Sequence, residues 1–250
     1  SIYYPGSAFG KLVKKGVSFI VRYNIRHARS IITVTEEFKN FLGSIGGREI
    51  TVIPNGVDSK LLKPLSKEES KRKLGLEGNI LGYVGSLEHW VDLETVIEAL
   101  PRLDAKLLII GPGLFTDYDD KIKQLAKDLG VSDKVIFTGV VKYQDLSPYI
   151  SAMDIGLNPL KKMKKNEETV GGKVFNYLAC GRPVLSSRMI SLERLLGNEI
   201  NYYDDVESFI HQTEHILSMA SDEQRYRTVA KEYDWRKIAD RYEKVLEKAV

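Results

Sequence analysis

The chain has 250 residues, of which 43% are hydrophobic and 28% charged, so it can bury one large or two modest apolar cores and is neither disordered nor fibrous. Its one cysteine, Cys180, excludes an intrachain disulfide or a thiolate metal site and favours a reducing, cytoplasmic compartment. The net charge of +3 is too small to indicate nucleic-acid binding, and the apolar runs are too short for a membrane-spanning helix or a secretory signal.

The first predicted element is a basic amphipathic helix over residues 9–29. When this segment is wound at about 100° per residue, its cations fall within an arc of roughly 120°, and apolar residues such as Leu12, Phe19 and Tyr23 lie opposite. The cations are Lys11, Lys14, Lys15, Arg22, Arg26 and Arg29. Two interpretations stay open: a solvated surface helix, or a helix that meets an anionic substrate or an anionic membrane surface and makes the protein peripheral there.

From residue 49 onward, short β-rich runs alternate with helical patterns. The expected strands are 49–53, 80–84, 106–110, 134–137, 154–158 and 183–186. The expected helices are 93–100, 118–129, 143–152 and 173–180. Because the strands are mostly apolar throughout, they indicate a parallel sheet that is buried on both faces, in a doubly wound, Rossmann-like α/β domain. Ligands of such sheets bind beyond the carboxyl ends of the strands, so the loops there are the informative ones.

The loop before residue 173 is the strongest candidate for a binding site. Gly171 and Gly172 lead directly into a predicted helix, whose first residue is Lys173. Glycine allows a ligand to approach the backbone closely, and the N–H groups at a helix start suit a phosphate. The alternative is a tight turn beside a solvated lysine.

Residues 168–184 resemble the donor-binding signature of retaining glycosyltransferases with the GT-B fold, family four (group 1). That family carries a glutamate, seven residues, a second glutamate, and a small-residue run that ends in Gly-x-Pro-Val. Glu168 takes the first position, Gly171 fits the family's glycine, and Asn176 stands at the second glutamate. Further segments resemble the family in the same order: 53–58, 83–85, 109–111, 135–141 and the closing element from Trp235.

The resemblance implies one half of a GT-B enzyme that moves a sugar from a UDP- or GDP-sugar to a hydroxyl of an acceptor glycan or lipid-linked sugar. Retention of anomeric configuration, with no metal and no cofactor, is implied as well. Glu168 would contact the donor sugar and Lys173 would stabilise the departing diphosphate, which makes these two the expected catalytic residues. The expected donor-binding residues are Gly85, Ser86, Gly139, Val140, Val141, Gly171, Gly172 and Asn176.

The chain departs from the family pattern at two places. Asn176 can still bond a ribose diol, but without a charge-assisted hydrogen bond. After the glycine that corresponds to Gly85, the family usually has an arginine and, a few residues later, a lysine, which together clamp the diphosphate. This chain has Ser86 after Gly85 and neither cation, so Lys173 is the expected replacement. These departures keep a second hypothesis open, a non-catalytic nucleotide-sugar-binding module that needs a partner domain.

Three segments are expected along the chain. Residues 1–48 would be the mostly helical end of the N-terminal, acceptor-side domain, residues 49–232 the nucleotide-sugar-binding domain, and residues 233–250 a C-terminal helix. Because GT-B enzymes react between two halves, we expect this chain alone to bind donor and to transfer sugar weakly or not at all.

Three other patterns have simpler interpretations. His211, Glu214 and His215 match the H-x-x-E-H motif of zinc peptidases, but a zinc site needs a third protein ligand, so a zinc hydrolase is a remote alternative. Residues 117–119 resemble a D-x-D metal motif, but they precede a predicted helix, where capping is the expected role. Residues 111–113, Gly-Pro-Gly, are expected to form a turn.

Overall fold

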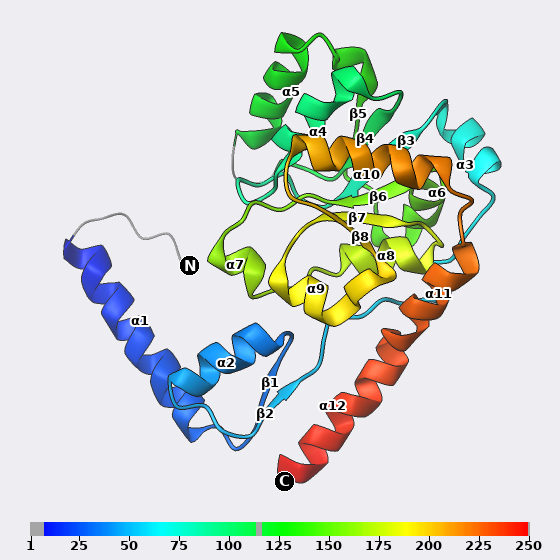
Figure 1. The fold of residues 1–250 in the computed structure, drawn as a ribbon. Coiled ribbons are helices and arrows are strands. Elements are labelled where there is room, and N and C mark those ends of the chain that lie inside the picture. Colours follow the sequence, from blue (N-terminus) through cyan, green and yellow to red (C-terminus); the bar gives the residue numbers. More distant parts are fainter. Residues whose placement is uncertain (1–7, 114–116, 250) are drawn as a thin grey trace. The chain divides into compact units, whose positions relative to one another are not determined.

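A computed structural model describes residues 8–113 and 117–249 of the chain (Figure 1). The chain forms two compact units. The first consists of residues 1–54 together with 239–250, and the second of residues 55–238. No helix among the described residues is both long enough and apolar enough to cross a bilayer.

The first unit contains a two-stranded parallel sheet. Its elements are α1 (Ala8–His27), β1 (Ile31–Thr33), α2 (Glu36–Ser44) and β2 (Ile50–Val52), together with most of α12 (Trp235–Ala249). Ile31 pairs with Ile50 and Thr33 with Val52. The basic helix predicted over residues 9–29 is confirmed as α1, and β1 was not expected.

The second unit is built on a six-stranded parallel sheet with the order β5-β4-β3-β6-β7-β8. Its strands are β3 (Ile80–Val84), β4 (Lys106–Ile110), β5 (Val135–Gly139), β6 (Ile155–Asn158), β7 (Val184–Ser187) and β8 (Asn201–Tyr203). Its helices are α3 (Lys67–Leu74), α4 (Leu93–Ala99), α5 (Tyr118–Asp128), α6 (Leu146–Ser151), α7 (Lys164–Glu167), α8 (Lys173–Ala179), α9 (Ile190–Leu196), α10 (Val206–Ser218) and α11 (Glu223–Glu232). The predicted doubly wound parallel α/β fold is therefore confirmed.

Both faces of this sheet are buried because each strand contributes alternate residues to a different core. In β4, Leu107 and Ile109 belong to the core beneath α4, α5 and α10, whereas Leu108 and Ile110 belong to the core beneath α3, α6, α8, α9 and α11. Figure 1 shows α10 along one side of the sheet and α8 and α9 along the other. The near-continuous apolar runs of the sequence are the signature of this arrangement.

The strand order reverses between β3 and β6. From β3 the chain continues outward to β4 and β5, and from β6 it continues in the other direction to β7 and β8. In open α/β sheets a ligand crevice lies beyond the carboxyl ends of the strands at such a switch point. A ligand is therefore expected at the loops that follow β3 and β6.

Candidate functional site

The loops after β3, β4 and β5 are tied together by backbone hydrogen bonds. Gly85 N–H donates to the Ile110 carbonyl at 2.9 Å, and Gly111 N–H donates to the Gly139 carbonyl at 2.9 Å. Gly111 has a φ of +140°, and a Cβ on it would lie 2.0 Å from the Gly85 carbonyl oxygen. Glycine at position 111 is therefore required by the close approach of two loops. In place of the expected turn over residues 111–113, the chain bends at Gly111 and Gly113 forms a parallel β-bridge with Leu87.

Tyr177 fixes α8 where β3 and β6 diverge. Its hydroxyl accepts a hydrogen bond from Val84 N–H at 2.8 Å and donates one to the Leu157 carbonyl at 3.1 Å, so it satisfies backbone groups of both strands. Gly156 leaves room for the ring, because a Cβ there would lie 2.4 Å from Tyr177 Cγ. Burial raises the pKa of Tyr177 above its usual range, which keeps the hydroxyl a donor.

Lys173 is the first residue of α8 and reaches the loop after β3. Its Nζ lies 3.4 Å from the hydroxyl oxygen of Tyr83 and 4.5 Å from the centroid of that ring. The Tyr83 hydroxyl in turn donates to the Ser86 carbonyl at 2.8 Å. Burial lowers the pKa of Lys173 to about 8. The structure thus brings together three of the predicted site residues, Gly85, Ser86 and Lys173.

Gly171 and Gly172 differ from the glycines of the strand loops. A Cβ on either would meet no atom within 4 Å, and neither has a positive φ. No packing contact or backbone conformation requires glycine at these two positions. The loop itself is held in place, because Asn55 Nδ2 donates to the Val170 carbonyl at 2.7 Å.

The two adjacent glutamates have different surroundings. The Glu167 carboxylate accepts a hydrogen bond from Ile190 N–H at 2.8 Å and so caps the start of α9. Glu168 lies 3.6 Å from Lys164, in a loose ion pair, with 21% of its side chain exposed. The Glu167 carboxylate therefore has a structural role at the start of α9, whereas the Glu168 carboxylate is paired with a side chain that is itself 75% exposed.

Short-range contacts anchor α7 to the loop after β3. Asn166 Nδ2 donates to the carbonyls of Trp90 at 3.0 Å and Lys161 at 2.7 Å. Lys165 Nζ lies 3.3 Å from the centroid of the Trp90 ring. The position of Glu168, one residue beyond α7, is consequently fixed relative to the β3 loop.

The segment after β5 meets α8 through Tyr143. Its hydroxyl donates to Asn176 Oδ1 at 3.3 Å. Val140 is 74% exposed, whereas Val141 is partly buried against the core. This contact brings the predicted residues Val140, Val141 and Asn176 to the same edge of the sheet.

The motifs that suggested metals do not form metal sites in the described residues. His211, Glu214 and His215 are all exposed on α10, and no group of three His, Cys, Asp or Glu side chains converges within 8–113 and 117–249. Asp117 occupies the N-cap position of α5 and Asp119 lies in its first turn, as expected for acids at a helix start, although the Asp117 side chain makes no capping hydrogen bond. Asp119 pairs with Lys123 at 3.1 Å.

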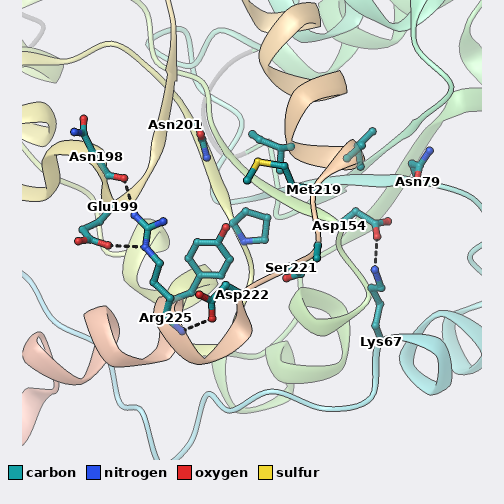
Figure 2. A pocket seen from close by; sticks show the side chains of 15 residues that line it. Lys67, Asn79, Asp154, Asn198, Glu199, Asn201, Met219, Ser221, Asp222 and Arg225 are labelled. Atoms are coloured by element: carbon teal, nitrogen blue, oxygen red, sulfur yellow. Dashed lines mark hydrogen bonds and ion pairs between the residues drawn. The ribbon is translucent and has the colours of Figure 1, made fainter.

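A cavity of about 490 Å³ lies at the opposite edge of the sheet (Figure 2). Its lining includes Asn79, Asp154 and Asn201, which precede or begin strands, whereas the predicted site residues follow strand ends. Figure 2 shows that its charged side chains pair with one another: Lys67 with Asp154 at 2.8 Å, and Arg225 with Glu199 at 3.1 Å. It is therefore a poorer ligand site than the carboxyl edge.

Three residues of the site were missed by sequence reasoning: Tyr83, Tyr177 and Asn55. Tyr83 lies inside a predicted strand and Tyr177 inside a predicted helix, where a tyrosine looks like ordinary core. Asn55 lies in the segment 53–58 that resembles the family, but no role was assigned to it. The available signal was the polar hydroxyl in an otherwise apolar run, since a buried tyrosine generally finds a hydrogen-bond partner.

Comparison with known proteins agrees with this fold. Residues 78–219, more than half of the chain, match the family described as "Glycosyl transferases group 1". A glycosyltransferase assigned to teichuronic acid biosynthesis in Bacillus subtilis, TuaH, is 28% identical over 199 residues, which cover 76% of this chain and 49% of that protein. The 2-deoxystreptamine glucosyltransferase of Streptomyces kanamyceticus is 25% identical over 197 residues, covering 74% and 49%. The chain spans about half the length of these relatives.

Solved structures share the fold at lower sequence identity. HepE of Anabaena in complex with UDP has a TM-score of 0.82 at 19% identity, over 94% of this chain and 68% of that one. The sucrose-phosphate synthase of Thermosynechococcus elongatus has a TM-score of 0.78 at 20% identity, over 94% and 61%. These neighbours are GT-B glycosyltransferases, so the second unit has the architecture of one half of that fold.

Proposed function

Because the chain belongs to the group 1 glycosyltransferases, we propose that it contains the donor-binding half of a retaining, family-four GT-B enzyme that moves a sugar from a UDP- or GDP-sugar to an acceptor hydroxyl. The acceptor would be a glycan or a lipid-linked sugar. HepE supports a nucleotide-sugar donor, since its structures hold UDP and UDP-glucose. The relatives named above are a glycosyltransferase and a glucosyltransferase, which supports sugar transfer as the reaction class.

The observation that carries this proposal is the position of Lys173. The partly buried amine of Lys173, whose pKa desolvation lowers to about 8, is stabilised when an anion arrives, because the anion offsets the cost of desolvating the charge. When a nucleoside diphosphate leaves an anomeric carbon, negative charge grows on the β-phosphate. A cation and N–H donors aimed at that oxygen lower the barrier, each donor by about 3 kcal/mol. Lys173 and the amides of Gly171 and Gly172 would supply them.

The other site residues receive roles in the same proposal. Glu168 would accept hydrogen bonds from the sugar hydroxyls, and Asn176 would bond the ribose. The backbone of Gly139, Val140 and Val141 would contact the base. The acceptor hydroxyl would pass its proton to the departing phosphate oxygen, so that neither a metal ion nor a dedicated general base takes part.

We assign the first unit to the acceptor-side half. Parallel strands generally lie inside larger sheets with both faces covered, and the β1–β2 pair has only two strands. Leu12, Phe19 and Ile20 of α1 are 68%, 71% and 58% exposed, which is the apolar surface that the remainder of such a half would cover.

Calorimetric titration of the chain with UDP- and GDP-sugars tests the proposal. We expect saturable binding to one series, weakened about tenfold or more by Glu168→Ala and by Lys173→Ala, because each removes a direct contact. Lys127→Ala, an exposed lysine on α5, is the control and should bind as the wild type does. Absence of binding to both series would contradict the proposal.

A transfer assay separates the enzyme from the binding module. The protein that contains both halves should transfer sugar, whereas the chain alone should bind donor with little turnover. Tight donor binding with neither transfer nor hydrolysis in the two-half protein would instead favour the non-catalytic module, for which the departures at Ser86 and Asn176 are the motivating feature.

A further inference from the structure

We propose that Tyr83 is a positioning residue. It holds the Lys173 ammonium at the carboxyl end of β3, beside Gly85 and Ser86, where the ammonium can contact the diphosphate of the donor. This inference rests on the proposed function and extends it to a residue that would touch neither the sugar nor the phosphate.

Tyr83 is placed to act on two loops at once. Its side chain is 1% exposed and is packed in the core beneath α4, α5 and α10, so the ring has little freedom. Only the hydroxyl reaches the edge of the sheet, where it donates to the Ser86 carbonyl at 2.8 Å. The oxygen can then accept the hydrogen bond from Lys173 Nζ, which lies 3.4 Å away.

The stem of Lys173 is confined as well as its ammonium group. A Cβ on Gly85 would lie 2.9 Å from the Tyr83 hydroxyl oxygen and 3.4 Å from Lys173 Cε. The lysine stem therefore passes over the bare backbone of Gly85 in close contact. Nζ lies 4.5 Å from the centroid of the Tyr83 ring, where the ring's negative face attracts a cation.

The hydroxyl stays protonated in this position. Burial first, and then the negative charge of Glu88, raise the pKa of Tyr83 above its usual range. Glu88 is itself 4% exposed and follows Ser86 in the same loop. Tyr177 of α8 also interacts with Tyr83, and the pKa of Tyr177 is raised too. The Tyr83 hydroxyl therefore stays protonated near neutral pH, donates its hydrogen bond to the Ser86 carbonyl and keeps a lone pair for Lys173.

Ordering a lysine in advance is useful because its long side chain otherwise loses rotamer freedom when it binds an anion. Tyr83→Phe is the direct test, since it keeps the ring and its packing but removes both hydrogen bonds of the hydroxyl. Tyr203→Phe in β8 is the matched control: Tyr203 is 2% exposed and lies at the far end of the same sheet.

Binding of UDP and GDP is measured calorimetrically in wild type, Tyr83→Phe, Lys173→Met and the double variant, at pH values on both sides of 8. For the nucleotide that binds, we expect about three- to tenfold weaker affinity in Tyr83→Phe and a lower pH midpoint for the loss of affinity, because the ammonium has lost an acceptor. Lys173→Met should remove this pH dependence, and Tyr83→Phe should add no further loss to it. Tyr203→Phe should behave as the wild type.

Two results would overturn the inference: an equal loss of nucleotide affinity from Tyr83→Phe with and without Lys173, or an unchanged pH midpoint in Tyr83→Phe.

A second readout does not depend on nucleotide binding. The rate at which acetic anhydride modifies Lys173, followed by mass spectrometry across the same pH range, should rise at lower pH in Tyr83→Phe than in wild type. If the wild type binds neither nucleotide but this shift is seen, the proposed function fails while the positioning by Tyr83 stands; identical profiles would sink the positioning role alone.

Discussion

Neither packing nor backbone conformation requires glycine at positions 171 and 172. Since a Cβ at either position would meet no protein atom within 4 Å, we expect Gly171→Ala and Gly172→Ala to fold with unchanged or slightly higher melting temperature. In the proposed complex, each added methyl group would stand between the donor and the backbone of this loop. We therefore expect donor affinity to fall about tenfold or more in calorimetric titrations.

Gly181 provides the contrasting substitution. It has a φ of +71°, and a Cβ there would lie 2.1 Å from Glu223 Cγ. Gly181→Ala should lower the unfolding free energy by about 1–3 kcal/mol and leave the affinity of the remaining folded protein intact. If Gly171→Ala lowers stability and leaves affinity unchanged, the loop is an ordinary turn.

The sequence reveals some residues of the candidate site and not others. Glu168, Gly171 and Lys173 stand close together in the chain, so a local pattern reveals them. Tyr83 is 90 residues from Lys173, and Tyr177 is 93 residues from the amide that it accepts from. Their contacts depend on which strands become neighbours, and a run of apolar residues does not carry that information.

Among the secondary-structure elements, the predictions were most accurate where the local signal is strong. The ranges 80–84 and 106–110 are confirmed residue for residue, because long apolar runs bounded by glycine and by charged or polar residues define them on both sides. β1 and β8, of three residues each, were missed, although Ile31 and Ile32 give β1 an apolar pattern like that of the equally short β2, which was predicted. The predicted helix 143–152 begins as a 3₁₀ turn, and α6 starts only at Leu146.

The helix α1 exposes the cations that the sequence grouped together. The side chains of Lys11, Lys14, Lys15 and Arg22 are exposed. Arg26 Nε donates a hydrogen bond to the Ile45 carbonyl at 3.2 Å and so links α1 to the end of α2. We expect the chain to sediment with vesicles that contain anionic lipid, and less so as salt rises, because each surface cation contributes about 1 kcal/mol.

The double substitution Lys14→Glu and Lys15→Glu should weaken vesicle binding about tenfold or more. Lys127→Glu, which reverses one exposed charge on α5, should have little effect. Equal sedimentation with neutral and anionic vesicles would rule out the membrane role and leave α1 as a solvated helix or as part of the acceptor-side half.

The free energy of unfolding of the whole molecule should fall at acidic pH because of Glu94 in α4. Burial alone would raise the pKa of this carboxyl, but hydrogen bonds from Lys121, Lys161 and Tyr118 outweigh it and lower the pKa to about 2. A carboxyl with a depressed pKa stabilises the fold fully above its unfolded value of 4.5, and the stabilisation is lost as pH falls toward about 2.

Glu94→Gln should therefore lower the unfolding free energy by about 1–2 kcal/mol near neutral pH, a figure that allows for its partial exposure. Urea denaturation measures this difference, and about half of it should be gone by about pH 3. Glu98→Gln, an exposed glutamate on the same helix, should show a far smaller difference at both pH values. A Glu94→Gln deficit that is independent of pH would show that the carboxylate charge is not its source.

The chain passes between its two units twice, at residues 54–55 and 238–239. On the second-unit side the two passages are joined, since Val57 N–H donates to the Tyr233 carbonyl at 2.9 Å and Trp235 N–H donates to the Val57 carbonyl at 3.1 Å. Asn55, the first residue after the crossing, holds the loop that carries Gly171 through the Val170 carbonyl. The Asn55 side-chain amide therefore joins the segment just after the crossing to the loop that carries Gly171.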